Sequence, residues 1–518
     1  MPHVVTQPCC ADASCVLACP VNCIHPAPGE PGFGTAEMVF IDGSECVDCG
    51  ACVTACPVGA IKPDSRLQPA ERRYIDLNAD YFRANPHPDR TPLALVKQHG
   101  ADPIDLQVAI VGAGPAGLYA ADELLKHPGV RVDVYDRLLT PHGLVRAGVA
   151  PDHQHTKLIQ DLFRSIEAED GFGYHLGVEV GKDITHAELM SAHHAVVYAV
   201  GAATDRALNI PGEDLDGSVS ATEFVAWYNG HPDQTGRTFD LSGKRAVVIG
   251  NGNVALDVAR VLMESPERLE KTDISDAALA ALKAGELAEV VVLGRRGPAE
   301  AAFTLPELIG LAGQDEIDIV VEGPVQVTSA KTALLAELKA RPTRPGRRRI
   351  TFRFHASPSR ITADQSGRVA GIETTAGRID TTLVIRAIGY RARAVPGLPF
   401  EEERAVVPND RGRVEPGVYV TGWIKRGPNG FIGTNKTDSE ETVRLLLDDA
   451  RAGLLSEPTT ELAAAGALCR DDWLRIDAAE RSAGAAQGRP RVKFLETQAL
   501  RDTAARSTRL PIKRRRRA

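Results

Sequence analysis

The sequence predicts an α/β protein with a small α+β module at its N-terminus, and three observations predict it. The chain has ten cysteines, and all but Cys469 precede residue 57. Two later stretches, 108–136 and 245–297, each read as a buried strand, a glycine-rich turn, a helix and a second strand. The content of hydrophobic residues is 43% and of charged residues 25%, as in ordinary globular proteins. With 518 residues, the chain has room for about three domains.

The cysteine run predicts iron–sulfur clusters. Cys46, Cys49, Cys52 and Cys56, followed by proline, have the spacing C-x2-C-x2-C-x3-C-P, in which the fourth cysteine ligates a second cluster. Partner cysteines are therefore needed, and they lie upstream: Cys9 or Cys10, Cys15 and Cys19. The alternatives are a zinc site, which usually pairs two C-x2-C arms without the prolines, and a disulfide framework. We predict a bacterial ferredoxin module with two clusters over residues 1–62.

An internal repeat supports this module. Cys15 and Cys19, followed by proline, match Cys52 and Cys56, and each half continues into a similar short tail. We expect a pseudo-twofold fold that depends on its metal, because so small a module has little core. The halves differ, since the first lacks the standard middle cysteine.

Residues 63–105 are predicted to be a linker, because prolines interrupt them repeatedly. The linker either packs across the rest of the chain or lets the module swing.

The first glycine-rich unit predicts dinucleotide binding. Gly112, Gly114 and Gly117 follow a buried strand and open a helix, and the next strand ends on Asp136. Gly112 makes the tight turn, Gly114 lets the backbone approach a pyrophosphate, and Gly117 packs helix on strand. The helix N-terminus faces the phosphates, and the acid takes a ribose hydroxyl.

The second unit has the same plan with a different ending. Gly250, Gly252 and Ala255 lie between a strand and a helix, and the following strand leads to Arg295 and Arg296. Arginines at this place meet a 2′-phosphate, which indicates NADP. The alternative is a solvated basic turn. Two such units in one chain suggest that the first binds FAD and the second binds NADP.

Two apolar strands that run into glycines, at 195–201 and 383–389, suggest where the chain crosses between domains. We therefore predict an FAD domain in two parts, 106–205 and 386–470, around an NADP domain, 206–385. Residues 471–518 form a C-terminal extension. Its basic run, 513–517, is a solvated tail or a docking strip for an acidic partner.

Composition excludes several classes. A net charge of −8 argues against nucleic-acid binding. The chain shows no signal peptide and no apolar stretch of the ~20 residues that span a membrane. A cytoplasmic, reducing location is expected, which suits thiolate ligands.

Four longer strings carry a family resemblance. They are 141–153, 250–257, 294–298 and 422–434, and they resemble adrenodoxin reductase-type ferredoxin–NADP reductases. With the N-terminal module, which resembles the seven-iron ferredoxins, the whole chain is similar to the actinobacterial fusion of a ferredoxin to such a reductase. The resemblance implies two Rossmann-like domains of the glutathione-reductase-like type.

The resemblance also implies ligand sets. Cys19, Cys46, Cys49 and Cys52 hold a [4Fe-4S] cluster. Cys56, Cys15 and one of Cys9 and Cys10 hold the second, a [3Fe-4S] cluster, or a [4Fe-4S] cluster if both cysteines of the doublet take part.

By the same resemblance, His153 and Asp257 shape the hydride-transfer site, although His153 is equally well explained as a structural histidine. FAD contacts are expected at Ala116, Asp136, Leu144, Val180, Trp423, Gly430, Phe431 and Ile432. NADP contacts are expected at Gly252, Asn253, Val254, Ala255, Arg295 and Arg296, with Glu307 near the nicotinamide. Two positions depart from the family. His142 replaces a usual aromatic residue, and some relatives carry a functional acid at the position of Gly310.

The implied function is a ferredoxin–NADP(+) reductase. NADPH gives hydride to FAD, single electrons pass to the clusters, and they leave to a ferredoxin or a cytochrome P450. One alternative is an electron-input subunit like the glutamate synthase small subunit, which lacks the strings at 143–146 and 422–428. Another is a redox sensor without turnover.

Overall fold

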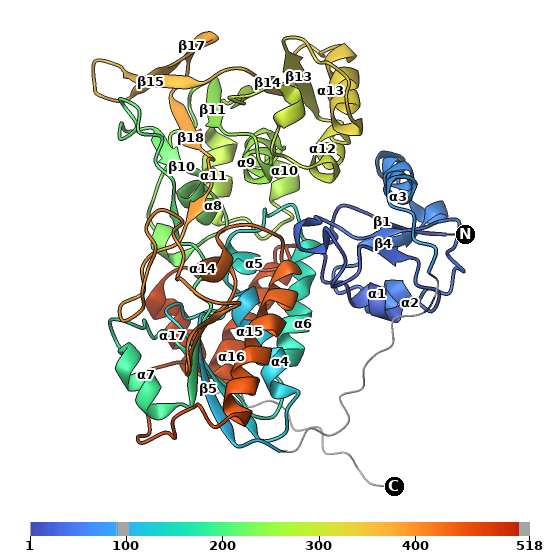
Figure 1. Ribbon diagram of the computed structural model, residues 1–518. Coiled ribbons are helices and arrows are strands. Elements are labelled where there is room, and N and C mark those ends of the chain that lie inside the picture. Colours follow the sequence, from blue (N-terminus) through green and yellow to red (C-terminus); the bar gives the residue numbers. More distant parts are fainter. Residues whose placement is uncertain (1, 90, 92–102, 507–518) are drawn as a thin grey trace.

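Three bodies make up the protein (Figure 1). The computed structural model describes residues 2–89, 91 and 103–506. The N-terminal module lies beside the junction of two α/β domains, each built on a six-stranded sheet. None of the described helices combines the length and apolar composition needed to cross a lipid bilayer.

The N-terminal module has the predicted internal symmetry. Antiparallel pairs join β1 to β4 and β2 to β3. The helix of the first half is preceded by Ala13 at φ 61° and that of the second by Gly50 at φ 74°. They are followed by Cys19 at φ −76°, ψ 116° and Cys56 at φ −77°, ψ 113°. The elements are β1 (His3–Val5), α1 (Ser14–Ala18), β2 (Ile24–His25), η1 (Phe33–Thr35), β3 (Phe40–Ile41), α2 (Ala51–Ala55) and β4 (Ile61–Pro63).

The predicted linker differs from expectation, because its first half is ordered structure. It contains η2 (Asp64–Arg66), η3 (Pro69–Glu71) and α3 (Arg73–Ala84). No proline lies between Pro69 and Pro86, which leaves room for a helix of 12 residues. The buried Asn78 of α3 accepts hydrogen bonds from the backbone of Val5 (3.2 Å) and Ile41 (2.9 Å). The helix is therefore part of the module, and most of residues 90–102 lies outside the described residues.

The first α/β domain has the strand order β20-β21-β8-β5-β6-β7, parallel except for β20. Its central strands β5, β8 and β21 are apolar and almost fully buried, as expected where a sheet is covered on both faces. The elements are β5 (Leu106–Val111), α4 (Pro115–Leu125), β6 (Val130–Asp136), α5 (Gly143–Ala147), η4 (Thr156–Leu158), α6 (Ile159–Ile166), β7 (Phe172–Leu176), α7 (His186–Ala192), β8 (Ala195–Tyr198), β20 (Arg413–Glu415), β21 (Val418–Val420), α14 (Trp423–Arg426) and α15 (Thr434–Arg451).

The second α/β domain has the parallel order β10-β18-β11-β12-β14-β13 and a three-stranded antiparallel sheet, β15-β16-β17. The segment between α9 (Asn253–Met263) and β12 (Glu289–Leu293) forms α10 and α11. The elements are β10 (Ser218–Ser220), α8 (Ala221–Tyr228), η5 (Pro232–Gln234), β11 (Arg245–Ile249), α9 (Asn253–Met263), α10 (Pro266–Leu269), α11 (Asp276–Ala284), β12 (Glu289–Leu293), η6 (Pro298–Glu300), α12 (Leu305–Ala312), β13 (Ile317–Glu322), α13 (Ala330–Ala340), β14 (Arg348–Arg353), β15 (Pro358–Ala363), β16 (Val369–Thr374), β17 (Gly377–Asp380) and β18 (Leu383–Arg386).

Two short strands carry the chain between the domains. β9 (Thr204–Asp205) and β19 (Tyr390–Arg391) pair antiparallel, with Asp205 opposite Tyr390. They follow the two strand-to-glycine stretches that the sequence suggested as crossings.

The C-terminal extension is also more than a tail. It contains α16 (Arg470–Ala485) and α17 (Thr497–Ala505), and α16 packs on the first α/β domain. Its Glu480 is 0% exposed and accepts hydrogen bonds from Arg146 at 2.9 and 2.6 Å. The basic run 513–517 lies outside the described residues.

Candidate redox site

The first glycine loop has the geometry that its residues predict. Gly112 has φ 113°, and a Cβ there would lie 2.5 Å from the carbonyl oxygen of Ala199. A Cβ on Gly117 would lie 2.0 Å from the carbonyl oxygen of Gly112. At Gly114 the nearest atom lies 4.0 Å away, on Gly143. Gly112 and Gly117 therefore pack tightly against the backbone, whereas Gly114 leaves space at the N-terminus of α4.

Asp136 ends β6 and braces this loop. Its Oδ2 accepts a hydrogen bond from the backbone N–H of Ala113, and its Oδ1 accepts one from Leu138, both at 2.8 Å. Burial raises the pKa of Asp136, while these two donors lower it. The predicted ribose acid thus also holds the turn in shape.

The C-terminal segment reaches the same place. A Cβ on Gly422 would lie 2.7 Å from the Cβ of Ala116, and Ser439 Oγ donates to the carbonyl oxygen of Ala116 at 2.8 Å. Trp423 begins α14, and its ring lies 5.2 Å from that of Tyr390. The segment therefore covers the open side of the loop. The other predicted contacts are Leu144 on α5, Val180 in an apolar cluster with Trp423, and Gly430, Phe431 and Ile432 just before α15.

The second loop repeats the first. Gly250 has φ 109°, and a Cβ there would lie 2.2 Å from the carbonyl oxygen of Ala387, whereas Gly252 has no atom within 4 Å of that position. Asn253, Val254 and Ala255 form the first turn of α9. Arg295 and Arg296 are exposed at the end of β12. Neither guanidinium forms an ion pair with another residue of the described chain.

Three predicted residues from separate elements converge between the domains. One ligating atom each of His153, Asp257 and Glu307 lies within 4.8 Å of the others. His153 precedes η4, Asp257 is on α9, and Glu307 is on α12. His153 Nδ1 lies 4.0 Å from Asp257 Oδ1.

Arg260, which no sequence motif identifies, places a positive charge beside this group. It lies one helical turn after Asp257 and donates to its carboxylate at 2.6 Å, and it also pairs with Asp152. Burial opposes the ionisation of Asp152, but the charge and hydrogen bonds of Arg260 outweigh it and lower the pKa of Asp152. For Glu307, burial and the charge of Asp257 raise the pKa to about 7. A carboxyl group with this pKa exchanges protons near neutral pH.

The N-terminal module contributes two further side chains. Gln7 Nε2 lies 3.0 Å from Glu307 Oε2 and 3.3 Å from His153 Nε2. Glu37 accepts hydrogen bonds from Thr304 Oγ1 (2.5 Å) and from Asn253 Nδ2 (3.3 Å) at the second glycine loop. These contacts join residues that are about 150 to 300 positions apart in the sequence, so no local sequence pattern could have revealed them.

The cysteines fall into two groups. One surrounds a hollow of the module lined by Cys19, Cys46, Cys49 and Cys52, together with Cys23. In the other, burial raises the pKa of Cys15, and the charges of Cys9 and Cys56 raise it further. The structure therefore gathers Cys19, Cys46, Cys49 and Cys52 around one hollow, and the second set stays a prediction.

Comparisons with known proteins agree with this geometry. The pyridine nucleotide-disulphide oxidoreductase family matches residues 106–429, and the 4Fe-4S binding domain matches residues 39–62. The chain belongs to the pyridine nucleotide-disulphide oxidoreductase family. A probable ferredoxin/ferredoxin–NADP reductase of Mycobacterium leprae is 47% identical over 98% of both chains. The human mitochondrial NADPH:adrenodoxin oxidoreductase is 40% identical, covering 76% of this chain and 90% of its own.

A solved structure supports the same assignment. Mycobacterium tuberculosis FprA in complex with NADPH is 40% identical, with a TM-score of 0.72 over 77% of this chain and 100% of its own. The resemblance to reductases of this type is confirmed, and with it the fold and an NADP-dependent flavoprotein oxidoreductase.

The residues fit the nucleotides that this oxidoreductase family implies. Each second glycine, Gly114 and Gly252, leaves space at a helix N-terminus, where backbone N–H groups attract a pyrophosphate. Bound flavin supplies hydride acceptance and single-electron release.

The cysteines fit an iron–sulfur cluster better than zinc. Four sulfurs around one zinc ion lie about 3.8 Å apart, because Zn–S bonds are about 2.3 Å and tetrahedral. All ten cysteines of the reductase are described, and no three of their sulfur atoms lie within 4.8 Å of one another. A 4Fe-4S-type cluster, which separates its ligands further, suits this spacing.

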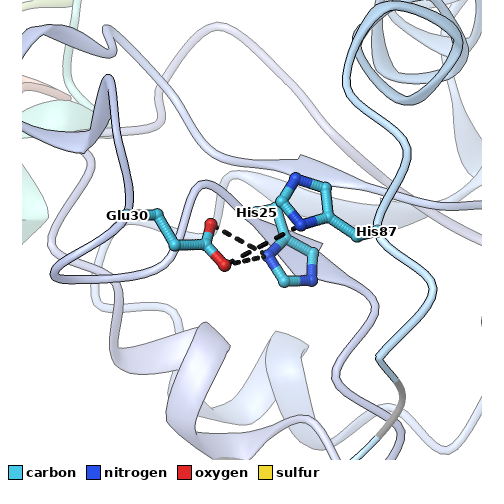
Figure 2. A group of neighbouring side chains, drawn as sticks. All are labelled: His25, Glu30 and His87. Atoms are coloured by element: carbon cyan, nitrogen blue, oxygen red, sulfur yellow. Dashed lines mark hydrogen bonds and ion pairs between the residues drawn. The ribbon is translucent and has the colours of Figure 1, made fainter.

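A second group of potential ligands ties the end of the α3 segment to the module. Figure 2 shows His25, Glu30 and His87 with the carboxylate facing both rings. His25 Nδ1 lies 3.0 Å from both Glu30 oxygens, and its Nε2 faces the carbonyl oxygen of Asn22 at 3.0 Å. The two rings are stacked 3.9 Å apart and nearly parallel, at 8°. Lone pairs in parallel planes do not converge on one ion, so hydrogen bonds and ring stacking hold this group together.

Proposed function

We propose that the chain is a ferredoxin–NADP(+) reductase with its own electron-accepting module, in which FAD takes hydride from NADPH and single electrons reach the clusters and then an external ferredoxin or cytochrome P450. The observation that carries this proposal is the contact between the first cysteine loop and the segment expected to cover the flavin. The backbone N–H of Gly433 donates to the carbonyl oxygen of Cys10 at 2.8 Å.

This contact is close and specific. A Cβ on Gly433 would lie 2.0 Å from the carbonyl oxygen of Ala11, so only glycine fits between the two backbones. Lys436, one turn into α15, pairs with the buried Asp12 at 3.3 Å. The loop that holds Cys9 and Cys15 is therefore fixed next to Phe431 and Ile432.

The position of the two cysteine groups supports an order of electron flow. In the group of Cys9, Cys15 and Cys56, the first two lie on the loop that contacts the reductase, and Cys56 follows α2. The group of Cys19, Cys46, Cys49 and Cys52 reaches the surface, where Cys49 is exposed and Val47 is 58% exposed. We infer that electrons enter at the first group and leave from the second.

A three-iron cluster is proposed at the entry site, with Cys9, Cys15 and Cys56 as its ligands. Cys10 instead contributes its backbone carbonyl to the contact with Gly433. All ten cysteines are free, which suits a reducing, cytoplasmic location.

An anaerobic NADPH titration of the purified protein tests the proposal. Absorption follows the flavin, and electron paramagnetic resonance distinguishes three-iron from four-iron clusters. We expect the flavin to bleach and cluster signals to change in step. Reduced flavin beside silent clusters would remove the internal route but keep the reductase. Absence of NADPH oxidation with ferricyanide would reject the enzyme and favour a redox sensor.

A further inference from the structure

The N-terminal module places a side chain within the hydride-transfer site expected for the reductase. Gln7 follows β1 in a tight turn that is held at both ends. The buried Thr6 donates through its N–H (2.9 Å) and its Oγ1 (2.8 Å) to the carbonyl oxygen of Ala60, and Cys9 N–H donates to Thr6 at 3.1 Å. The turn therefore projects Gln7 out of the module in a fixed direction.

The target of this projection is the cluster of His153, Asp257 and Glu307. The side chain of Gln7 borders a cavity of about 220 Å³ that residues of all three bodies line. Its amide nitrogen lies 3.0 Å from Glu307 Oε2 and 3.3 Å from His153 Nε2. An amide NH₂ carries two hydrogens and no lone pair for hydrogen bonding, so it donates to both.

This double donation sets the state of both partners. His153 Nε2 accepts, so the hydrogen of the neutral ring is on Nδ1, the nitrogen that faces Asp257 Oδ1 at 4.0 Å. Glu307 accepts as a carboxylate, although burial raises its pKa to about 7. A donor at 3.0 Å favours the ionised form of Glu307.

Gly310 makes this approach possible. It lies three residues after Glu307 on α12, so both positions are on one face of the helix. A Cβ at Gly310 would lie 2.7 Å from the amide nitrogen of Gln7. The absence of a side chain at Gly310 leaves the space that the module's amide occupies.

We propose that Gln7 is a positioning residue of the reductase site, supplied by the ferredoxin module over Gly310 to fix the tautomer of His153 and the orientation of Glu307. The inference rests on the proposed function, because it assigns Gln7 to the site where NADPH reacts. Several other charged or titratable groups face this site: Glu37 and Tyr74 from the module and α3, Asp152 before η4, and Asp257, Arg260, Glu264 and Arg268 from the second α/β domain.

A double-mutant cycle on the full-length holoenzyme tests the inference. Gln7→Ala removes the amide. Gly310→Ala displaces the amide from the site without changing residue 7. Each single variant should slow flavin reduction by saturating NADPH about two- to tenfold, the effect of one or two hydrogen bonds. In the double variant the methyl group has nothing to displace, so the effects should not add. Gly310→Ala also favours the helix, so unfolding does not explain a loss.

Two pH readouts separate positioning from packing. Without the amide, the titration of Glu307 should move to higher pH, both in the rate of flavin reduction and in the equilibrium dissociation constant for NADP⁺. Gln7→Asn, which keeps a shorter amide, should restore part of the shift. Gln314→Ala is the matched control, because Gln314 lines the same cavity but bonds Arg268 at 3.1 Å.

Additive losses with unmoved pH profiles would mean that Gln7 only packs against the site, and the inference would fail. Wild-type rates in both single variants would overturn it as well. In either case, NADPH oxidation by the wild-type protein would leave the proposed function intact. A wild-type protein that does not oxidise NADPH would instead reject the proposed function itself.

Discussion

The two glycine loops of the protein have almost the same backbone and very different surroundings. Their first glycines have φ 113° and 109°, and the residues before their helices have ψ −178° and −179°. The first loop is enclosed by its own domain, through Asp136, Gly143 and the segment after Gly422. The second is bordered by exposed arginines and by Glu37 of the N-terminal module.

This difference matches the two roles expected of the loops. A flavin that stays bound suits a loop enclosed by permanent contacts. A nicotinamide nucleotide that binds and leaves each cycle suits an open loop at a module boundary. The same backbone can therefore serve a resident cofactor or a substrate, and the neighbouring side chains decide which.

The largest effect is expected at the first glycines. In Gly112→Ala the new Cβ would meet the Ala199 carbonyl at 2.5 Å with φ at 113°, and neither backbone can move away. The protein should lose its flavin, measured as the ratio of flavin to protein absorbance. In Gly252→Ala the Cβ enters open space at φ −88°. The Gly252→Ala variant should keep its flavin and have a higher KM for NADPH. Equal flavin loss in both variants would contradict the comparison.

His142 tests how firmly the first loop is enclosed. Its N–H bonds Ala113 at 2.8 Å, and its buried ring lies 2.6 Å from Glu167 Oε1. His142→Phe keeps an aromatic ring but removes the hydrogen bond to the buried Glu167, which retains only the one from Tyr174. The loss costs about 1–3 kcal/mol. The temperature of flavin release should fall.

Glu167→Leu added to His142→Phe is the control for that variant. It removes the stranded carboxylate, so much of the loss should be recovered. An unchanged release temperature in His142→Phe alone would show that the pair does not hold the loop.

The exposed arginines test the openness of the second loop. A hydrogen bond to a charged group contributes about 1.5–3 kcal/mol, so Arg295→Ala or Arg296→Ala should raise the KM for NADPH roughly 10- to 100-fold. NADH, which lacks the 2′-phosphate, is the internal control, and its KM should hardly change. Equal losses with both nucleotides would favour the alternative of a solvated basic turn.

Local patterns predicted much of this protein, and long-range contacts account for what they missed. The glycine loops and cysteine spacings were predictable because each is contiguous in sequence and needs particular residues. The connector was misjudged because its prolines flank the helix Arg73–Ala84 and do not interrupt it. The C-terminal helix was not foreseen, because the buried Glu480 reads as a surface residue until Arg146 and Arg491 surround it. Gln7 and Glu37 acquire their place only when the module docks.

The smallest predicted effect concerns Glu37 and the pH dependence of nucleotide binding. Burial raises the pKa of Glu37 to about 7, while hydrogen bonds from Thr304 and Asn253 lower it. Below pH 7 the group is mostly neutral, and above pH 7 it is a carboxylate beside the loop that receives phosphates. NADP⁺ should therefore bind more weakly as the pH rises from 6.5 to 8.5, by about two- to fivefold for a partly exposed charge pair.

Equilibrium titration with NADP⁺ at each pH measures this effect. In Glu37→Gln the dissociation constant should hardly change with pH and should equal the wild-type value at low pH. Glu45→Gln, at an exposed acid of the same module, controls for net charge. A slope that persists in Glu37→Gln would assign the titration to another group, Glu307 or the nucleotide's own 2′-phosphate. A flat profile in Glu37→Gln would mean that the docked module regulates nucleotide binding at the open loop through the proton on Glu37.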